Sequence, residues 1–196
     1  MDPRAGVTPS IRNFAQAIDR QRQSLERVPL LDAAREDLES AALALDEAEV
    51  AALAIAGADA AARFAAAARA VSVPVLLADL LAEEYRIYES RAAGADAVML
   101  PGALPQEVLA RLLRAASSTH MAGCVACASA EEVERAGAAR APVIAVAPPL
   151  LHVPVPPRTL LLSLSFHPSA RGRADAALDA SLHDAAAFRA ALEEEG

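Results

Sequence analysis

Short apolar runs alternate with helical segments along most of this chain of 196 residues. The runs are almost continuously apolar, as is typical of parallel strands that are buried on both faces. Repeated strand–helix units predict a parallel sheet covered by helices. The predicted strands are residues 28–34, 50–56, 73–78, 97–100, 124–128, 142–147 and 159–166, with a short one at 174–178.

Six segments with helical periodicity follow these strands as predicted outer helices: residues 38–49, 58–70, 81–93, 105–118, 129–138 and 185–195. Gly94 ends the third of them, and Ser129, with Glu132 three residues later, begins the fifth as a capping box. The stretch PPLLHVPVPP after the sixth strand cannot be a helix. Two α/β architectures fit this pattern: a (βα)8 barrel trimmed of one or two outer helices, and an open doubly wound sheet.

The N-terminal part is more polar than the rest. Ile11–Glu26 has a helical period, so we expect residues 1–27 to form a helical extension and residues 28–196 to form one domain. No apolar run follows a basic stretch at the N-terminus, and six prolines exclude Ala141–Pro157 as a membrane-spanning helix. We therefore expect a soluble, cytoplasmic protein.

The charge and composition limit the partners. The formal net charge is -8 and aromatic residues make up only 3% of the chain, so neither nucleic acid nor a membrane is expected as a partner. All 18 basic residues are arginines. Arginine keeps its proton, so chemistry that needs a lysine to release a proton or form a Schiff base is excluded.

Cys124 and Cys127 lie in the apolar run GCVACA, which is predicted to be a strand. Three residues apart on a strand, their side chains point to opposite faces. We interpret them as buried, small apolar residues, with a redox or metal-binding pair as the alternative. We expect no metal and no cofactor.

The segment VPVLLADLLAEEYRIYESRAAGADAVMLPGAL, residues 73–104, resembles the indole-3-glycerol phosphate synthase family. The family's helix of the form YQIYEARAAGAD matches residues 85 and 87–89 and residues 91–96 in order, and ASAEEVERA, residues 128–136, is similar to the fifth family helix. The resemblance implies a (βα)8 TIM barrel. It also implies ring closure of an anthranilate-derived ribulose phosphate with loss of carbon dioxide and water.

Such chemistry needs a proton donor, carboxylates that move protons, and a cation for the substrate carboxylate. The resemblance implies that the lysine of the family's third strand falls on Ala78, next to a retained aspartate, Asp79. The glutamate of the fifth strand falls on Ala126, and the asparagine of the sixth falls on Ala147. The resemblance therefore implies that this chain lacks the family's catalytic groups.

The first strand matches less clearly. One register places Ala33 on the family's glutamate and Arg35 on its lysine, and a slip by one residue would place Asp32 or Ala34 there instead. We predict Arg35 and Asp79 as ligand-binding residues at the barrel mouth, with an ion pair at its rim as the alternative. We predict no catalytic residue.

This chain also differs from the family at the positions of the phosphate site. The resemblance implies glycines after the seventh and eighth strands, where backbone amides approach the phosphate. Gly172 is the only glycine between Ala138 and Glu195, and Asp179 occupies the position of a glycine in the last loop. We expect this aspartate to repel a phosphate.

These losses favour a non-catalytic relative of the synthase, a pseudoenzyme that works through protein contacts. The stretch Ala141–Pro157 lies where an outer helix would cover the barrel, so we expect an exposed apolar surface there. A homo-oligomer or another protein partner would bind through it. The alternatives are an active synthase that uses Arg35 and Asp79, and a small-molecule sensor.

Overall fold

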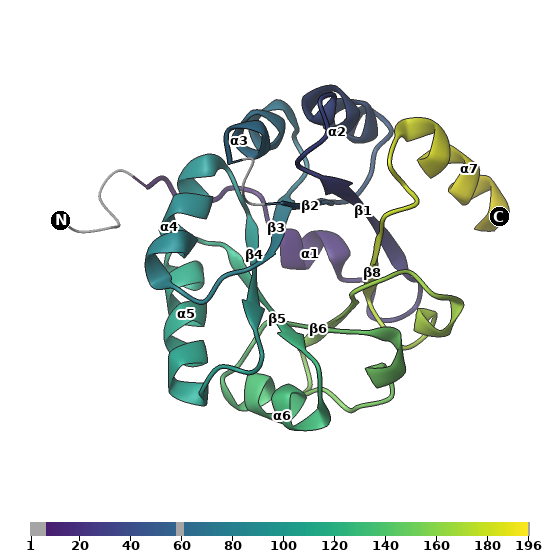
Figure 1. Cartoon of the computed structure of the whole chain (residues 1–196). Helices are drawn as coiled ribbons and strands as arrows, with labels where there is room; N and C mark the ends of the chain where they lie inside the picture. The colour runs from purple at the N-terminus through teal and green to yellow at the C-terminus, as the bar shows by residue number, and fades with distance from the viewer. Residues whose placement is uncertain (1–6, 58–60, 196) are drawn as a thin grey trace.

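The structure is a computed structural model that describes residues 7–57 and 61–195. Over these residues, eight parallel strands close into a barrel in which each strand pairs with the next and β8 pairs with β1 (Figure 1). The predicted trimmed (βα)8 TIM barrel is confirmed, and the open sheet is excluded. The strands are β1 (Glu26–Asp32), β2 (Leu53–Ala56), β3 (Val75–Leu80), β4 (Ala97–Pro101), β5 (Ala122–Cys127), β6 (Val143–Val146), β7 (Leu160–Ser163) and β8 (Ala176–Asp179).

Six outer helices cover the barrel in the described part of the chain: α2 (Leu38–Glu47), α3 (Ala61–Ala70), α4 (Glu84–Ala93), α5 (Gln106–Ser118), α6 (Ala130–Ala138) and α7 (Ala185–Glu195). After β6 and β7 the chain forms only short 3-10 turns, η2 (Pro148–Leu150) and η3 (Pro168–Ala170). Residues 1–6 and 58–60, which belong to the predicted extension and the predicted second outer helix, lie outside the described residues. None of the described helices is long and apolar enough to cross a membrane.

Two predicted helix ends are confirmed. Gly94 follows α4 in the left-handed region, with φ of 110°, where glycine has no steric penalty. The hydroxyl of Ser129 accepts the N–H of Glu132 at the start of α6. The Glu132 carboxylate accepts the N–H of Ala128, one residue before the position that a capping box uses.

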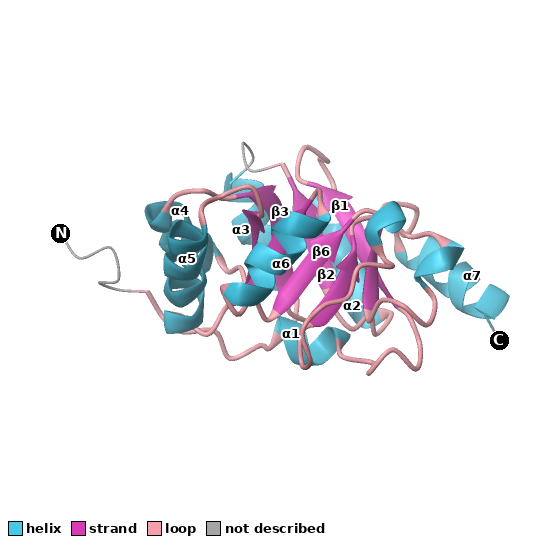
Figure 2. Ribbon diagram, turned by 90° about the horizontal axis from the view of Figure 1, so that it is seen from below, coloured by secondary structure: helices cyan, strands magenta, loops and turns pink. Residues whose placement is uncertain are grey.

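The N-terminal helix is shorter than its periodicity predicts. The predicted helix Ile11–Glu26 is wrong, because α1 covers only Phe14–Ile18. Residues 21 and 22 adopt left-handed backbone conformations, and Glu26 already belongs to β1. Phe14 and Ile18 are fully buried among the interior residues of the barrel, so α1 closes the amino-terminal end of the strands (Figures 1 and 2).

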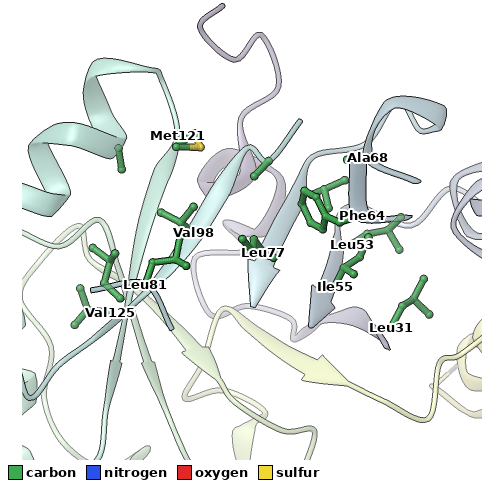
Figure 3. Packing of buried hydrophobic residues seen from close by; sticks show 14 of the residues in the cluster. Leu31, Leu53, Ile55, Phe64, Ala68, Leu77, Leu81, Val98, Met121 and Val125 are labelled. Atoms are coloured by element: carbon green, nitrogen blue, oxygen red, sulfur yellow. The ribbon is translucent and has the colours of Figure 1, made fainter. Parts of the chain in front are cut away.

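Side chains alternate between the barrel interior and an outer layer along the strands. The interior cluster contains Leu76, Met99 and Leu162 together with the two buried side chains of α1. The outer cluster lies between the strands and the helices; Figure 3 shows Leu31, Leu53, Ile55, Phe64, Ala68, Leu77, Leu81, Val98, Met121 and Val125 from it. This alternation sets which residues of each strand can reach the site at the barrel mouth.

The two cysteines lie on opposite faces of β5, as predicted. Cys124 packs in the barrel interior and Cys127 packs in the outer cluster, and both are free thiols. Burial raises the pKa of each thiol to about 12. Because the thiolate is the reactive form, both thiols are unreactive in the folded protein at neutral pH.

We expect the native protein to show no reaction with the thiol reagent DTNB at neutral pH. After unfolding in guanidinium chloride, both cysteines should react, because they are then solvated with ordinary pKa values. The measurement is the absorbance of the released thiol before and after denaturation. A thiol that reacts within seconds in the native protein would contradict the buried placement of both side chains.

A buried aspartate fastens the N-terminal segment to the barrel. The Asp96 carboxylate is fully buried before β4, and it accepts the N–H of Val75 at 2.9 Å. It also pairs with Arg12 at 2.7 Å and with Arg91 at 2.8 Å, and it accepts the hydroxyl of Ser10. Charge-assisted bonds of this kind are stronger than neutral ones, so this network holds residues 10–12 against the bottom of β3 and β4.

The segment Ala141–Pro157 does not expose the apolar surface that we expected. Leu151 is buried, and Val153 and Val155 pack against the outer cluster. The five large apolar side chains that are exposed in the described residues all lie elsewhere: Ile11, Leu43, Leu80, Tyr85 and Leu192. The expectation fails because the segment folds back and covers the barrel itself. Its prolines form the outer edge, where the Pro156 ring packs so closely on Gly137 of α6 that a Cβ there would lie 2.7 Å away.

Candidate functional site at the barrel mouth

The carboxyl ends of all eight strands open at the end of the barrel opposite α1, and we call this end the mouth (Figure 2). In (βα)8 barrels the functional residues lie at this end. Four partly buried side chains pack on top of the interior cluster and form its floor: Leu30, Ala78, Ala126 and Leu164. They come from β1, β3, β5 and the residue after β7, which is the alternate-strand layering of such barrels. None of these four side chains can give or take a proton.

Five surface cavities lie away from the mouth floor. Five surface cavities of about 320 to 920 Å³ are lined by described residues, and none of these five includes a residue of the floor. Ligand sites usually enclose most of a small molecule in a concave pocket. These five cavities therefore lie away from the place where a barrel enzyme holds its substrate.

The two predicted ligand-binding residues are not paired with each other. Arg35 holds both carboxylate oxygens of Asp37 at 2.9 Å, and it donates to the backbone carbonyl of His183 at 2.8 Å. The Arg35 hydrogen bonds lower the pKa of Asp37. Asp79 accepts the N–H of Gly57 with both oxygens, at 3.1 and 2.9 Å. Each side chain therefore links one loop of the mouth to another, and their role in ligand binding stays a prediction.

The side chains of the first strand alternate between the interior and the outer cluster. Val28 packs in the interior and Leu30 lies in the floor, whereas Leu31 and Ala33 belong to the outer cluster. Ala33, one position that the resemblance offers for the family's glutamate, therefore does not face the interior, whereas strand alternation gives Asp32 the inward position at the end of β1. Asp32 accepts the N–H of Ala34 at 2.8 Å, so its carboxylate also stabilises the local turn. The sequence match alone left both registers open.

Asp179, at the carboxyl end of β8, is buried and paired with Arg27, so its charge is neutralised and the repulsion of a phosphate that we expected from it is weakened. Its carboxylate is buried beside β1, where Arg27 donates to it at 2.8 and 2.7 Å. The backbone N–H and the hydroxyl of Ser181 complete its contacts, at 2.9 and 2.6 Å. The Arg27 guanidinium also lies 4.1 Å from the ring centre of Phe166. The pair is a structural link between β8, β1 and the loop after β7.

A different carboxylate occupies the place where an anion would bind after β8. Helix N-termini attract phosphates because their first N–H groups lack partners. Here Asp184 precedes α7, and its Oδ1 accepts the N–H of Ala187 at 2.8 Å. That bond lowers the pKa of Asp184, so the carboxylate is ionised at neutral pH. The start of α7 is thus capped by its own acid, which opposes phosphate binding.

An eight-stranded parallel barrel, closed at one end by a helix and open at the carboxyl ends of its strands, places this chain among the (βα)8-barrel proteins. Residues 36–152 match the family model for indole-3-glycerol phosphate synthase. The chain belongs to that family.

Relatives with that name share one part of the chain. The indole-3-glycerol phosphate synthase of Rhodococcus jostii is 44% identical over 82 residues, which is 41% of this chain and 30% of the relative. The protein of the same name from Kineococcus radiotolerans is 45% identical over 78 residues, 39% of this chain and 28% of the relative. The match therefore spans under a third of the length of these relatives. The activity of the family is accordingly a hypothesis for this chain.

Proposed function

We propose that this chain is a non-catalytic member of the indole-3-glycerol phosphate synthase family that acts through protein contacts. One observation carries the proposal: the mouth floor consists of alanines and leucines. Ala78 and Ala126 lie in it, at the places where the resemblance puts the lysine and the glutamate. Ala147, at the place of the asparagine, is an exposed methyl group after β6.

The charges near the mouth support the proposal. The family's substrate, as the resemblance implies, carries a carboxylate and a phosphate. The acidic groups here include Asp32, Asp79 and Asp184. Of the nearby cations, Arg35 is held by Asp37 and a carbonyl oxygen, and Arg63 donates to the carbonyl of Ala34. Acidic groups repel a substrate that carries two anionic groups rather than stabilise it.

An active synthase is the competing function, because the relatives that match this chain carry that name. It would need Arg35 or Asp79 to move protons. Arginine cannot release one, and Asp79 is held by the N–H of Gly57. Removal of one general acid or base typically slows an enzyme by about 10²–10⁴-fold, and here several groups are missing together.

A bacterial tryptophan auxotroph without its own indole-3-glycerol phosphate synthase tests the proposal. We expect this chain to give no growth on medium without tryptophan, while the Rhodococcus jostii relative restores growth from the same vector. Immunoblots and circular dichroism of the purified chain establish that it is expressed and folded. Growth at the rate of the relative would overturn the proposal and favour the active synthase.

The surface for the protein contacts is a separate part of the proposal. A partner at Ala141–Pro157 remains a prediction, and it would meet the exposed prolines Pro154, Pro156 and Pro157 rather than an apolar patch. These rings lie on a segment whose valines are already packed inward. A rigid, extended edge of this kind suits recognition by an aromatic-lined groove on another protein.

A further inference from the structure

A groove of about 920 Å³ lies at the end of the barrel opposite the mouth. Residues of α5, the end of α6 and the N-terminal segment line it, and its inner wall is the start of β5. Figure 1 shows where these elements lie in the fold. Ile11 stands at its edge with 99% of its surface exposed, and Leu113 contributes to its wall. The groove therefore offers apolar contacts to a partner.

The charged side chains that line this groove are all arginines, Arg12, Arg114 and Arg140, and His120 lies beside them. Arg12 is engaged by Asp96 and by backbone carbonyls. Arg114 and Arg140 are exposed, and their side chains form no ion pair or hydrogen bond with any described residue. On a chain with a net charge of -8, this is a local positive surface. Two unpaired arginines beside apolar side chains suit an acidic segment with an apolar residue of its own.

The end of α7 has that chemistry. Within this helix only Phe188 and Ala191 are among the buried core residues, and Leu192 is 53% exposed. Glu193 and Glu194 follow it, exposed and without a partner among the described residues. The helix projects from the barrel beside α2, on the side away from α5 and α6 (Figures 1 and 2). It therefore cannot reach the groove of its own chain.

We propose that the groove between α5 and α6 binds the acidic end of α7 from a second copy of this chain. Glu193 and Glu194 would face Arg114 and Arg140, and Leu192 would pack near Ile11. The contact joins two different surfaces, so it is heterologous and can extend from copy to copy. This self-association names a partner for the protein contacts of the proposed function, and it rests on the proposed function only in that respect.

The wild-type protein is expected to gain mass with concentration in sedimentation velocity at about 0.01 M salt, where the screening length is about 30 Å. At about 1 M salt, where that length is about 3 Å, it should sediment as a monomer. The contact is small and electrostatic, so its strength depends on salt. A monomer at every concentration and salt would overturn the proposal.

Charge reversal identifies the two surfaces. The groove variant Arg114→Glu/Arg140→Glu should be monomeric, because its acidic groove repels the acidic end of α7. The helix variant Glu193→Arg/Glu194→Arg should also be monomeric, because its basic helix end repels the basic groove. An equimolar mixture of the two variants should associate again, because each reversed surface meets a complementary one. Association of the wild type with no recovery in the mixture would overturn the assignment of these surfaces.

A matched control is Arg86→Glu/Arg111→Glu, which changes the net charge as much as the groove variant but alters exposed arginines of α4 and α5 that do not line the groove. This variant should associate like the wild type, and loss of association in it would show a net-charge effect instead. Because these experiments measure mass and not activity, a lack of self-association would leave the proposal of a non-catalytic protein intact. Growth of the auxotroph would in turn leave the self-association intact.

Discussion

Replacement of Asp96 by asparagine is expected to lower the free energy of unfolding by about 3–5 kcal/mol. The Asp96 carboxylate is fully buried, and the side chains of Arg12 and Arg91 are only 17% and 14% exposed. An amide keeps the shape of the side chain but removes the charge, so two largely buried guanidinium groups lose their counter-ion. The measurement is urea unfolding followed by circular dichroism, with the midpoint and slope fitted for each variant.

The matched control is Glu89→Gln, the same chemical change at an exposed carboxylate. Glu89 is 3.5 Å from Arg86, and both side chains are largely solvated, at 43% and 50% exposure. Exposed pairs of this kind contribute about 0–1 kcal/mol. If Asp96→Asn were as mild as Glu89→Gln, the network at the bottom of the barrel would not stabilise the fold as we argue.

The other half of the barrel provides a graded comparison. Asp175 precedes β8 as Asp96 precedes β4, and it accepts the N–H of Leu161 at 2.8 Å. Its arginine, Arg22, is 3.7 Å away and 42% exposed. Because that guanidinium is already solvated, Asp175→Asn should destabilise the protein less than Asp96→Asn.

Periodicity in the sequence predicted the parallel sheet and most of its outer helices, and the family resemblance favoured the closed barrel over the open sheet. Eight apolar runs separated by helical segments leave few arrangements, and prolines excluded a helix after β6. The opposite placement of Cys124 and Cys127 followed from strand geometry alone. These features are local, so nearby residues decide them.

Features that depend on contacts distant in sequence were missed. A helical period predicted Ile11–Glu26 as one helix, but burial of Phe14 and Ile18 in the barrel end limits α1 to a single short segment. The fold-back of Val153 and Val155 onto the outer cluster was likewise invisible in the sequence. In both cases the tertiary packing decided the outcome, and composition could not show it.

The site was predicted in part for the same reason. The alanines at 78 and 126 were assigned to the mouth from the family match, and strand alternation places both in its floor. Arg35 was matched by position, but its neighbour Asp37 and the carbonyl of His183, far along the chain, determine its orientation. Motif position identifies which residue stands at a site, whereas the surrounding contacts decide what that residue does.

Asp179→Gly restores the residue that the family pattern places in the last loop, yet we expect it to destabilise the protein by about 3–5 kcal/mol. Asp179 is buried, and Arg27 beside it is only 12% exposed. The substitution removes both contacts to the Arg27 guanidinium and the two bonds from Ser181. Urea unfolding measures the loss.

The same variant should gain no affinity for phosphate. Asp184 still caps α7 with an ionised carboxylate, and the interior floor stays apolar. Thermal unfolding with and without millimolar inorganic phosphate should therefore give the same midpoint.

The control is Arg27→Met/Asp179→Leu, which replaces the whole pair by apolar side chains and should destabilise the protein less than the single change. A stable Asp179→Gly variant that is further stabilised by phosphate would show that a phosphate site lies one substitution away. A destabilised variant that phosphate does not stabilise would mean that the Asp179 carboxylate serves to hold β8 against β1 in the closed barrel.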